Sequence, residues 1–353
     1  MQERYRLAWG RLTAIPAQEA DLPSVTIIIA ARNEVHRIRP TLNALHRLVY
    51  PGPLEILILD DHSTDGTADL IRDHLPPRAR CLALSGTGKR AALVEGLQVA
   101  SGEIILLTDA DCVPGIDWAS SMIQPFSHPG IDWVSGPVTS VAGTDMVSRY
   151  DALEWQGLMV ITGAGFALGR PVLAQGANMA FRKSRLAELG GIQGFPSRAS
   201  GDDVFLLSLF QQDDAHRCHF QQDIRALVQT AAPDSWRALV RQRLRWTSKS
   251  GHLDVWHGLA PMALTWLACL VLLATPVLFY ALPAHSAPLS LLPILVKFMA
   301  DYRLLRAGWQ FSCARFTWMD VLLASLIQPV LVVISGWIGP LRPGYLWKGR
   351  RVQ

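Results

Sequence analysis

Two pairs of aspartates stand directly after apolar runs of the chain: Asp60-Asp61, and Asp109 with Asp111. In a parallel sheet the carboxyl ends of the strands share one edge, so we expect both pairs at the same edge, on neighbouring strands. Carboxylates placed side by side raise each other's pKa, so a hard divalent ion, Mg²⁺ or Mn²⁺, is the expected companion, and it can in turn bind a diphosphate. Aspartates that merely end strands and begin turns are the alternative, which suits Asp60-Asp61 alone but not both pairs.

The apolar runs before these aspartates belong to an alternation of strands and helices. We expect strands at Val25–Ala30, Leu54–Leu59 and Glu103–Thr108, and helices at Arg39–Leu48, Thr67–His74 and Ala91–Ala100. Further helices are expected near residues 148–160 and 203–212. Nearly continuous apolar strands are typical of a parallel sheet that is buried on both faces. The order βαβαβ predicts an open α/β sheet that binds its ligand at the carboxyl ends of the strands.

The composition narrows the class of protein. The 353 residues suggest about two domains, and a chain that is 50% hydrophobic and 18% charged is neither disordered nor fibrous. The formal net charge of +4 is unevenly divided, because residues 251–353 hold eight Lys/Arg against three Asp/Glu, a local charge of +5. A nucleic-acid-binding domain would concentrate basic residues on a polar surface, so we expect no nucleic-acid partner. A basic, apolar, Trp-rich C-terminal part indicates a membrane.

A basic stretch precedes the first apolar segment of this C-terminal part. Arg237–Ser250 holds five basic residues and no acid, and Leu259–Leu282 after it contains no charge. Leu259–Leu282 meets the roughly 20-residue length of a membrane helix. A soluble core helix of that length without a polar face is the weaker alternative. The basic stretch is interpreted as an interfacial helix that contacts anionic headgroups; a solvated helix face is the alternative.

A further apolar segment, Val321–Ile338, is also expected to span the membrane, with Trp318 and Trp337 at interfacial positions. Ser286–Ala300, which contains Lys297, is expected to be a span or a re-entrant helix. The predicted organisation is an N-terminal interfacial or packing segment at 1–24, an α/β domain at 25–235, a basic interfacial helix at 236–257 and a membrane region at 258–353, with two or three helices at about 259–282, 286–305 and 319–339.

Other features are not expected to do chemistry. The five cysteines are scattered without zinc spacing, which favours a reduced, cytosol-facing protein, and Cys112 is interpreted as a small buried filler rather than a nucleophile. Gly86–Lys89 lacks the first glycine of a phosphate-binding loop, and Arg90 stands where that loop has Ser or Thr. No signal peptide is expected, because arginines interrupt the N-terminal segment.

Seven short motifs follow one another between residues 25 and 246. They are Ile27–Glu34, Leu59–Thr67, Gly88-Lys89-Arg90, Asp109-Ala-Asp111, Gly176–Phe181, Gly201-Asp-Asp203 and Gln242-Arg-Leu-Arg-Trp246. In this order they resemble the motifs of family 2 glycosyltransferases with the GT-A (Rossmann-like) nucleotide-sugar-binding fold. The last three resemble the acceptor-side motifs of the membrane-bound branch, including the Q-x-x-R-W of cellulose synthases, hyaluronan synthases and ceramide glucosyltransferases. The resemblance implies a GT-A mixed-sheet domain followed by C-terminal transmembrane helices.

The resemblance also implies a role for each matching residue. The expected substrate-binding residues are Ala30, Arg32, Glu34, Asp60, Asp61, Lys89, Asp109, Asn178, Gln242, Arg245 and Trp246. Among them Asp61 is the expected partner of the nucleobase, Lys89 is expected near the diphosphate, and Asp109 is expected to contact the ribose or the sugar. Asp111, together with Asp109, is the expected ligand of a divalent metal, Mg²⁺ or Mn²⁺.

The expected catalytic residues are two further aspartates. Asp203 matches the general base of the family, and Asp202 stands before it where many relatives have Glu. Such a base takes the proton of the incoming hydroxyl, while a divalent ion with Lys89 or Arg245 neutralises the leaving diphosphate. A site with one base and no second, nucleophilic carboxylate inverts the anomeric centre.

The expected function is therefore the inverting transfer of a sugar from a nucleotide sugar, a UDP-sugar in most of the resembling group, to a hydroxyl of a membrane lipid. The expected protein is an integral, multi-pass membrane enzyme whose catalytic domain faces the cytosol. A processive polysaccharide synthase, a catalytically silent nucleotide-sugar-binding membrane protein and a nucleotidyltransferase are the alternatives. The sequence leaves open the sugar, the acceptor, the number of spans, the side of the C-terminus and the oligomeric state.

Overall fold

The structure, a computed structural model, describes residues 1–13, 15, 22–192, 202–247, 260–281, 283, 287–339, 345–347 and 350–352. The chain forms two compact units, and each is assembled from separate stretches of sequence. The sheet unit comprises Arg11–Thr139, Thr162–Ala231 and Leu346–Gln353, and the helical unit comprises Met1–Gly10, Ser140–Ile161 and Ala232–Tyr345. The domains predicted from the sequence are continuous, whereas these units are not.

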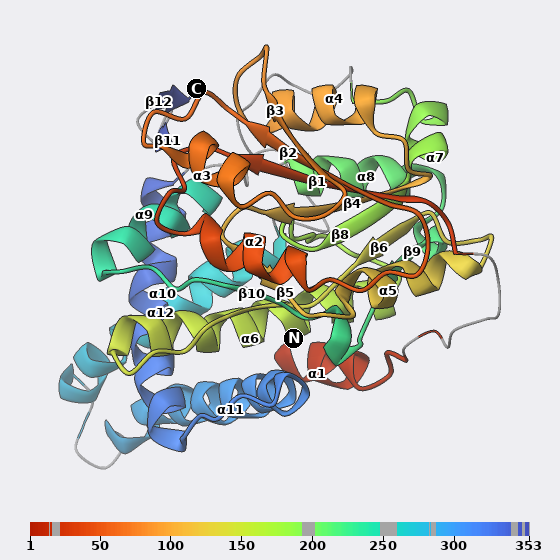
Figure 1. The fold of residues 1–353 in the computed structure, drawn as a ribbon. Coiled ribbons are helices and arrows are strands. Elements are labelled where there is room, and N and C mark those ends of the chain that lie inside the picture. The colour runs from red at the N-terminus through yellow and green to blue at the C-terminus, as the bar shows by residue number, and fades with distance from the viewer. Residues whose placement is uncertain are drawn as a thin grey trace. The chain divides into compact units, whose positions relative to one another are not determined.

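A seven-stranded mixed sheet is the centre of the sheet unit (Figure 1). Its order is β3 (Ala79–Ala83), β2 (Leu54–Asp60), β1 (Val25–Ala31), β4 (Ile104–Asp109), β8 (Met179–Arg182), β6 (Trp133–Ser135) and β9 (Cys218–Phe220). The first four strands are parallel, and β8 runs antiparallel to both β4 and β6. The predicted α/β sheet is confirmed, and each of the three predicted strands lies within one residue of its observed bounds.

Four strands of this sheet were not predicted, for two physical reasons. β3 is an edge strand, and its alternation of half-buried and exposed residues lacks the continuous apolar pattern of the central strands. β6, β8 and β9 have only three or four residues, which is too short for a hydrophobic period to show. Burial is nearly complete in the strands that the sequence did predict, as at Ile27 and Leu57, because helices cover both faces of a parallel sheet.

The expectation that Asp60 and Asp109 end neighbouring strands is wrong. β1 lies between β2 and β4, so that Ala31 pairs with Asp60 on one side and Ala30 pairs with Asp109 on the other. The three strands are parallel, so both aspartates still stand at the same carboxyl edge of the sheet. The order of strands is set by non-local pairing, which the order of strands along the sequence does not reveal.

Helices lie on both faces of the sheet, with α4 on one face and α2 and α5 on the other (Figure 1). The helices of the sheet unit are α2 (Ile38–His46), α3 (Thr67–Asp73), α4 (Lys89–Val99), α5 (Trp118–Ile123), α7 (Lys183–Glu188) and α8 (Asp202–Asp213), with 3-10 turns η1 (Gln124–Ser127), η2 (Ala215–Arg217) and η3 (Ile224–Ala226). Gly96 brings α4 close to the sheet, since a Cβ there would lie 3.1 Å from Ile28. A second sheet consists of β5 (Cys112–Pro114), β10 (Val228–Thr230) and β7 (Val138–Ser140).

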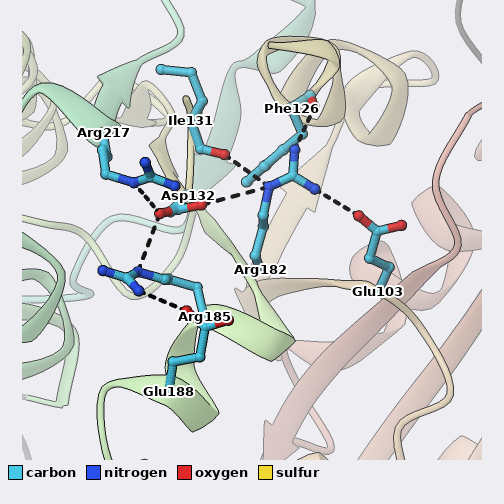
Figure 2. A network of polar contacts seen from close by, with 8 residues as sticks. All are labelled: Glu103, Phe126, Ile131, Asp132, Arg182, Arg185, Glu188 and Arg217. Carbon is cyan, nitrogen blue, oxygen red and sulfur yellow. Dashed lines mark hydrogen bonds and ion pairs between the residues drawn. The ribbon is translucent and has the colours of Figure 1, made fainter. Parts of the chain in front are cut away.

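A network of ion pairs fastens the antiparallel half of the large sheet (Figure 2). Its charged members are Glu103, Asp132, Arg182, Arg185, Glu188 and Arg217. Asp132, only 2% exposed, lies at its centre: the Arg217 Nε donates to it at 2.5 Å, and the Nε atoms of Arg182 and Arg185 lie 3.6 and 3.4 Å from its oxygens. The three acids and the three arginines balance in charge, so the network has no net positive charge. Its role is to connect the segments from which these residues come.

The helical unit contains long helices. The longest are α10 (Ala260–Ala281), α11 (Leu292–Ser312) and α12 (Trp318–Ile338); the others are α1 (Gln2–Trp9), the first sixteen residues of α6 (Met146–Ala167), α9 (Trp236–Thr247) and the 3-10 turn η6 (Ala287–Leu291). The strands β11 (Tyr345–Trp347) and β12 (Arg350–Val352) come after these helices in the chain, and β12 belongs to the sheet unit. The core of this unit is apolar and is formed by Val147, Tyr150, Leu153, Leu239, Val321 and Ala324. The N-terminal helix packs on α11, where the rings of Trp9 and Phe311 meet edge to face at 5.4 Å. The helices predicted near 148–160 and 203–212 are confirmed as parts of α6 and α8.

Among the helices that the structure describes, α10 and α12 are long and apolar enough to cross a membrane by length and composition. They correspond to the predicted segments 259–282 and 319–339, of which residues 259 and 282 lie outside the described part of the chain. The middle helix, α11, extends seven residues beyond the predicted end at 305 and contains four charged side chains: Lys297, Asp301, Arg303 and Arg306. It is as long as α12, but its charges make it less apolar than α10 and α12.

Candidate active site

Two carboxylates and a thiol gather at the carboxyl end of β4. The ligand atoms of Asp109, Asp111 and Cys112 all lie within 4.8 Å of one another. Burial, reinforced by the neighbouring Asp109 carboxylate, raises the pKa of Asp111, against the opposing charges of Arg37 and Lys89. Burial also raises the pKa of the Cys112 thiol well above its usual value, so the thiol stays protonated. The donors that remain are carboxylate oxygens, and these fit Mg²⁺ or Mn²⁺ rather than a soft metal.

Lys89 brings a positive charge to this pair of acids. It is the first residue of α4, and its ammonium group forms an ion pair with Asp109. Gly88 before it has a φ of +91°, a left-handed value that favours glycine. The side chains of Lys89 and Asp109 are 35% and 36% exposed, so both remain accessible to a ligand.

Gly176 is the point where Lys89 approaches a third acid. A Cβ at this glycine would lie 3.1 Å from the Lys89 Nζ and 3.5 Å from the Asp203 carboxylate. The Gly176 N–H donates to the Asp203 Oδ2 at 3.2 Å, and the Val204 N–H donates to the Oδ1 at 3.0 Å. The structure thus brings Asp109, Lys89 and Asp203 together, although they come from β4, α4 and α8. The side chain of Asp202 lies outside the described part of the structure.

The acids at the end of β2 have partners within the fold. Arg32, 7% exposed, donates from its Nη1 to the carbonyl oxygen of Asp61 at 2.5 Å, and its Nη1 lies 3.8 Å from the Asp61 carboxylate. The Ser63 N–H donates to the Asp60 Oδ2 at 3.2 Å, whereas the buried Oδ1 of Asp60 has no hydrogen-bond partner among the described residues. Glu34 is 8% exposed, and its N–H donates to the Thr67 hydroxyl at 2.7 Å.

The loops beside these acids hold strained backbone. Asn33 and His62 have φ values of +48° and +51°, in the left-handed region that residues other than glycine seldom adopt. Their loops are joined by hydrogen bonds: the Asn33 N–H donates to the Ser63 hydroxyl at 3.1 Å, and the Thr64 N–H donates to the Asn33 side chain at 2.9 Å. Strain of this kind persists only where surrounding contacts impose it, and it is common in ligand-binding loops.

Asn178 has a structural role in the fold. Its side chain is fully buried, accepts from the Trp118 Nε1 at 2.9 Å and donates to the carbonyl oxygens of Pro137 and Ala226 at 2.8 Å each. These bonds use both amide N–H groups and the oxygen, so the amide joins one side chain and two backbone carbonyl groups of the sheet unit. Its expected role in binding a substrate stays a prediction.

The Q-x-x-R-W residues lie in α9 and belong to the helical unit. The Trp246 ring meets the Trp155 ring edge to face, with the centroids 5.6 Å apart. The Gln242 Oε1 accepts from the Arg243 Nη1 at 2.6 Å. Arg245 is half-buried. Asp109, Lys89 and Asp203 belong to the other compact unit.

Arg243, which sequence reasoning missed, connects this motif to α6. The residue is 6% exposed, and its guanidinium forms ion pairs of 2.6 Å with both Asp151 and Glu154 and lies over the Trp246 ring. Burial alone lowers the pKa of Arg243, but the two carboxylates outweigh it and raise the pKa overall. One sequence signal could have identified it: Arg243 follows the buried Leu239 by four residues, so both lie on the same face of the helix.

Comparisons with known proteins agree with this fold. Residues 26–190 match the model of the family described as Glycosyl transferase family 2. The poly-beta-1,6-N-acetyl-D-glucosamine synthase of Staphylococcus epidermidis is 25% identical over 251 residues, which are 69% of this chain and 58% of that protein. The beta-monoglucosyldiacylglycerol synthase of Nostoc sp. is 34% identical over 117 residues, 31% of this chain and 25% of that protein. The chain thus spans only part of the length of these relatives.

A solved structure extends the likeness over nearly the whole chain. The mannosyltransferase PcManGT from Pyrobaculum calidifontis, in complex with GDP-Man and Mn²⁺, superimposes with a TM-score of 0.58. The superposition covers 96% of this chain and 93% of that chain at 20% identity, a level that supports the fold alone. Residues 26–190 thus match glycosyl transferase family 2, and the chain adopts the GT-A fold.

Proposed function

We propose that this protein transfers a sugar from a nucleotide sugar, a UDP-sugar, to a hydroxyl group of a membrane lipid, with inversion at the anomeric carbon. One observation carries the proposal: Lys89, Asp109 and Asp203 converge around Gly176 at the carboxyl edge of the sheet. Such a displacement needs three groups: a cation for the leaving group, an acid that binds the metal or the sugar, and a base for the acceptor. Lys89, Asp109 and Asp203 would supply them in that order.

The leaving diphosphate is the first demand of the reaction. The Lys89 ammonium stands at the N-terminus of α4, where the helix dipole also favours an anion. Asp109 and Asp111 would hold a divalent metal, which when bound neutralises the charge that develops on the diphosphate. The ion pair with Asp109 keeps Lys89 beside that position.

Deprotonation of the acceptor is the second demand. The two N–H groups that donate to Asp203 hold its carboxylate in a fixed position. In the proposed step the acceptor oxygen bonds to the anomeric carbon, the bond from that carbon to the diphosphate oxygen breaks, and Asp203 takes the hydroxyl proton. A single base acting on the face opposite the leaving group gives inversion.

The identity of the acceptor is proposed from the helical unit. α10 and α12 have the length and apolar composition of membrane helices, which supports a protein held at a membrane. The basic residues before α10 favour a nucleotide-sugar site on the cytosolic side. The Nostoc relative is a diacylglycerol glycoside synthase by name, and the Staphylococcus relative is a polysaccharide synthase by name. We favour single transfer to a lipid, because extruding a hydrated polymer requires a channel with many helices.

The test is a panel of labelled nucleotide sugars incubated with membranes from an expressing host, with and without Mn²⁺, followed by lipid extraction. A single labelled glycolipid is the expected product; a ladder of long glycans contradicts single transfer and favours the processive alternative. Asp203→Asn should retain UDP binding and lose transfer, whereas Asp69→Asn on the exposed face of α3 should retain both. If neither the parent nor Asp69→Asn transfers any sugar yet both bind UDP, the protein is the catalytically silent binder instead.

A further inference from the structure

Both ends of α12 are held by helices that carry charged side chains. At the N-terminal end, Arg149 of α6 forms a two-bond ion pair with Asp320, with N–O distances of 2.7 and 2.5 Å. At the C-terminal end, the Thr247 hydroxyl of α9 donates to the carbonyl oxygen of Ser335 at 3.0 Å. The two holding helices are joined to each other by the ion pairs of Arg243. The connected pair of helices α6 and α9 therefore contacts both ends of α12.

The middle of α12 also meets charged groups. Ser325 donates to the Asp301 Oδ2 of α11 at 2.7 Å, and the Lys297 ammonium donates to the Gln328 side chain at 2.7 Å. Lys297 and Asp301 form an ion pair with each other, and Gln2 of α1 donates to the same carboxylate at 2.7 Å. Ionic groups thus contact α12 at its N-terminal end and at half its length, and a neutral hydrogen bond holds its C-terminal end.

The opposite face of α12 is an apolar stripe. Six of its eight exposed large apolar side chains follow the three- and four-residue spacing of one helix face: Met319, Leu323, Leu326, Val330, Ile334 and Trp337; Trp318 and Ile338 are the other two. Each is at least 37% exposed. α12 itself contains one charged side chain, Asp320, and the charges beside the middle of its packed face belong to Lys297 and Asp301 of α11. An apolar stripe next to such groups is the arrangement of a segment that lies in a membrane interface.

The lengths of the helices distinguish an interfacial position from a crossing. A 21-residue helix is about 31 Å long, enough to put its two ends on opposite sides of a bilayer. The 12-residue α9 is only about 18 Å long, and its exposed face carries Arg237 and Arg241. If α12 crossed the bilayer, the helices that contact it would lie beside it within the membrane. The arginines of α9 and the Lys297–Asp301 pair of α11 would then lie in or near the hydrocarbon, where charged side chains are strongly disfavoured.

We infer that α12 does not cross the bilayer but lies in the plane of an anionic membrane surface. The stripe from Met319 to Trp337 enters the acyl chains, and Arg237 and Arg241 of α9 face the phosphate headgroups, to which their charge is complementary. The inference rests on the membrane association in the proposed function and not on sugar transfer. It places the beginning and the end of α12 on the same side of the membrane.

Depth measurements along the stripe test this position. Single cysteines at Met319, Leu326 and Ile334 are labelled with an environment-sensitive fluorophore in a Cys81→Ser, Cys313→Ser background, since the other three cysteines are buried. The protein is bound to vesicles that contain phosphatidylglycerol and lipids brominated at shallow or deep acyl positions. We expect all three labels to be quenched most by the shallow bromine. Strongest quenching of the Leu326 label by the deep bromine, with shallow labels at both ends, would show a crossing helix, and no quenching at any position also overturns the inference.

The headgroup contact has a separate test. Arg237→Gln and Arg241→Gln should each weaken binding to phosphatidylglycerol vesicles about fivefold, from roughly 1 kcal/mol per basic residue near an anionic surface. Binding to vesicles of phosphatidylcholine alone should not change. Equal binding of the parent and both variants to anionic vesicles contradicts the proposed orientation of α9. UDP binding is measured on the same samples, so a failure of the sheet unit is distinguished from a failure of this inference.

Discussion

The guanidinium carbon of Arg243 lies 4.2 Å from the centroid of the Trp246 ring. The same guanidinium donates to Gln242 and forms ion pairs with Asp151 and Glu154 of α6. A buried arginine with two carboxylate partners and an aromatic ring has little freedom to move, because each of its contacts constrains its position. Arg243 therefore holds two residues of the Q-x-x-R-W motif in place while itself occupying a variable position of that motif.

Replacing Arg243 should reveal this dependence. Arg243→Met leaves the fully buried Asp151 without its cationic partner, so we expect the free energy of unfolding to fall by about 3 to 5 kcal/mol. Arg241→Met, two residues earlier on the exposed face, should change it by less than about 0.5 kcal/mol. Urea unfolding in detergent measures both. Equal stability of the two variants would show that the buried ion pairs do not hold α9 to α6.

Removing a carboxylate from the candidate metal site should weaken cation binding. Asp111→Asn keeps the shape of the side chain and loses its charge, so Mn²⁺ affinity in the presence of UDP should fall at least about tenfold, as expected for the loss of a charged ligand. Asp69→Asn is the matched control. Titration followed by Mn²⁺ electron paramagnetic resonance gives the affinity, and an unchanged value for Asp111→Asn would exclude Asp111 as a ligand.

The pH dependence of that binding follows from the raised pKa of Asp111. A metal must displace any proton on this carboxylate, so the Mn²⁺ affinity should fall as the pH falls through the raised value, above the ordinary Asp pKa of about 3.9. In the absence of metal, the contribution of Asp111 to folding stability changes with pH in the opposite direction. The folded state binds the proton more tightly than the unfolded state, so this contribution is largest at low pH and falls as the pH rises. Asp111→Asn should abolish both effects; a parent protein with pH-independent Mn²⁺ affinity across this range would contradict the assignment.

His219 in β9 should make the fold sensitive to acid. Burial lowers its pKa from 6.5 to about 4, so the unfolded chain binds a proton on His219 between these values while the folded chain does not. Stability should therefore fall as the pH drops from about 6.5 to 4, by up to about 3 kcal/mol. His219→Gln should lose that part of the pH dependence, and the exposed His216→Gln should keep it. Thermal unfolding between pH 4 and 7 compares the three proteins, and identical profiles would exclude His219 as the source.

Asn178→Ala separates a structural role from a substrate-binding role. The substitution leaves the Trp118 N–H and two buried carbonyl oxygens without partners, so we expect a loss of about 2 to 4 kcal/mol in the free energy of unfolding. UDP affinity, measured well below the melting temperature, should stay within about twofold. Asn43→Ala on the exposed face of α2 provides the comparison. A stable variant that no longer binds UDP would reverse the assignment.

The sequence predicted candidate site residues in the sheet unit because the patterns that mark them are local. Acids directly after apolar strands, a glycine before Lys89, and a charge-free segment of membrane length are each visible within a short window of residues. The predicted bounds of β1, β2 and β4 agree with the observed bounds within one residue, because a strand buried on both faces is a continuous apolar run. Short strands such as β6, β8 and β9 have no such run, and only pairing with neighbours makes them strands.

Tertiary structure decided which of these residues meet. The sequence placed the strands of Asp60 and Asp109 side by side, but β1 separates them, because strand order depends on contacts between distant segments. Asp203 reaches Gly176 and Lys89 only through the packing of α8, and the role of Arg243 depends on acids ninety residues away in α6. Hydrophobicity along the chain likewise indicated α12 as a crossing helix, whereas its polar contacts with α6, α9 and α11 belong to the folded unit. The composition and hydrophobic periodicity of a segment indicate which of its residues are buried. The segment against which they pack is decided by the whole fold.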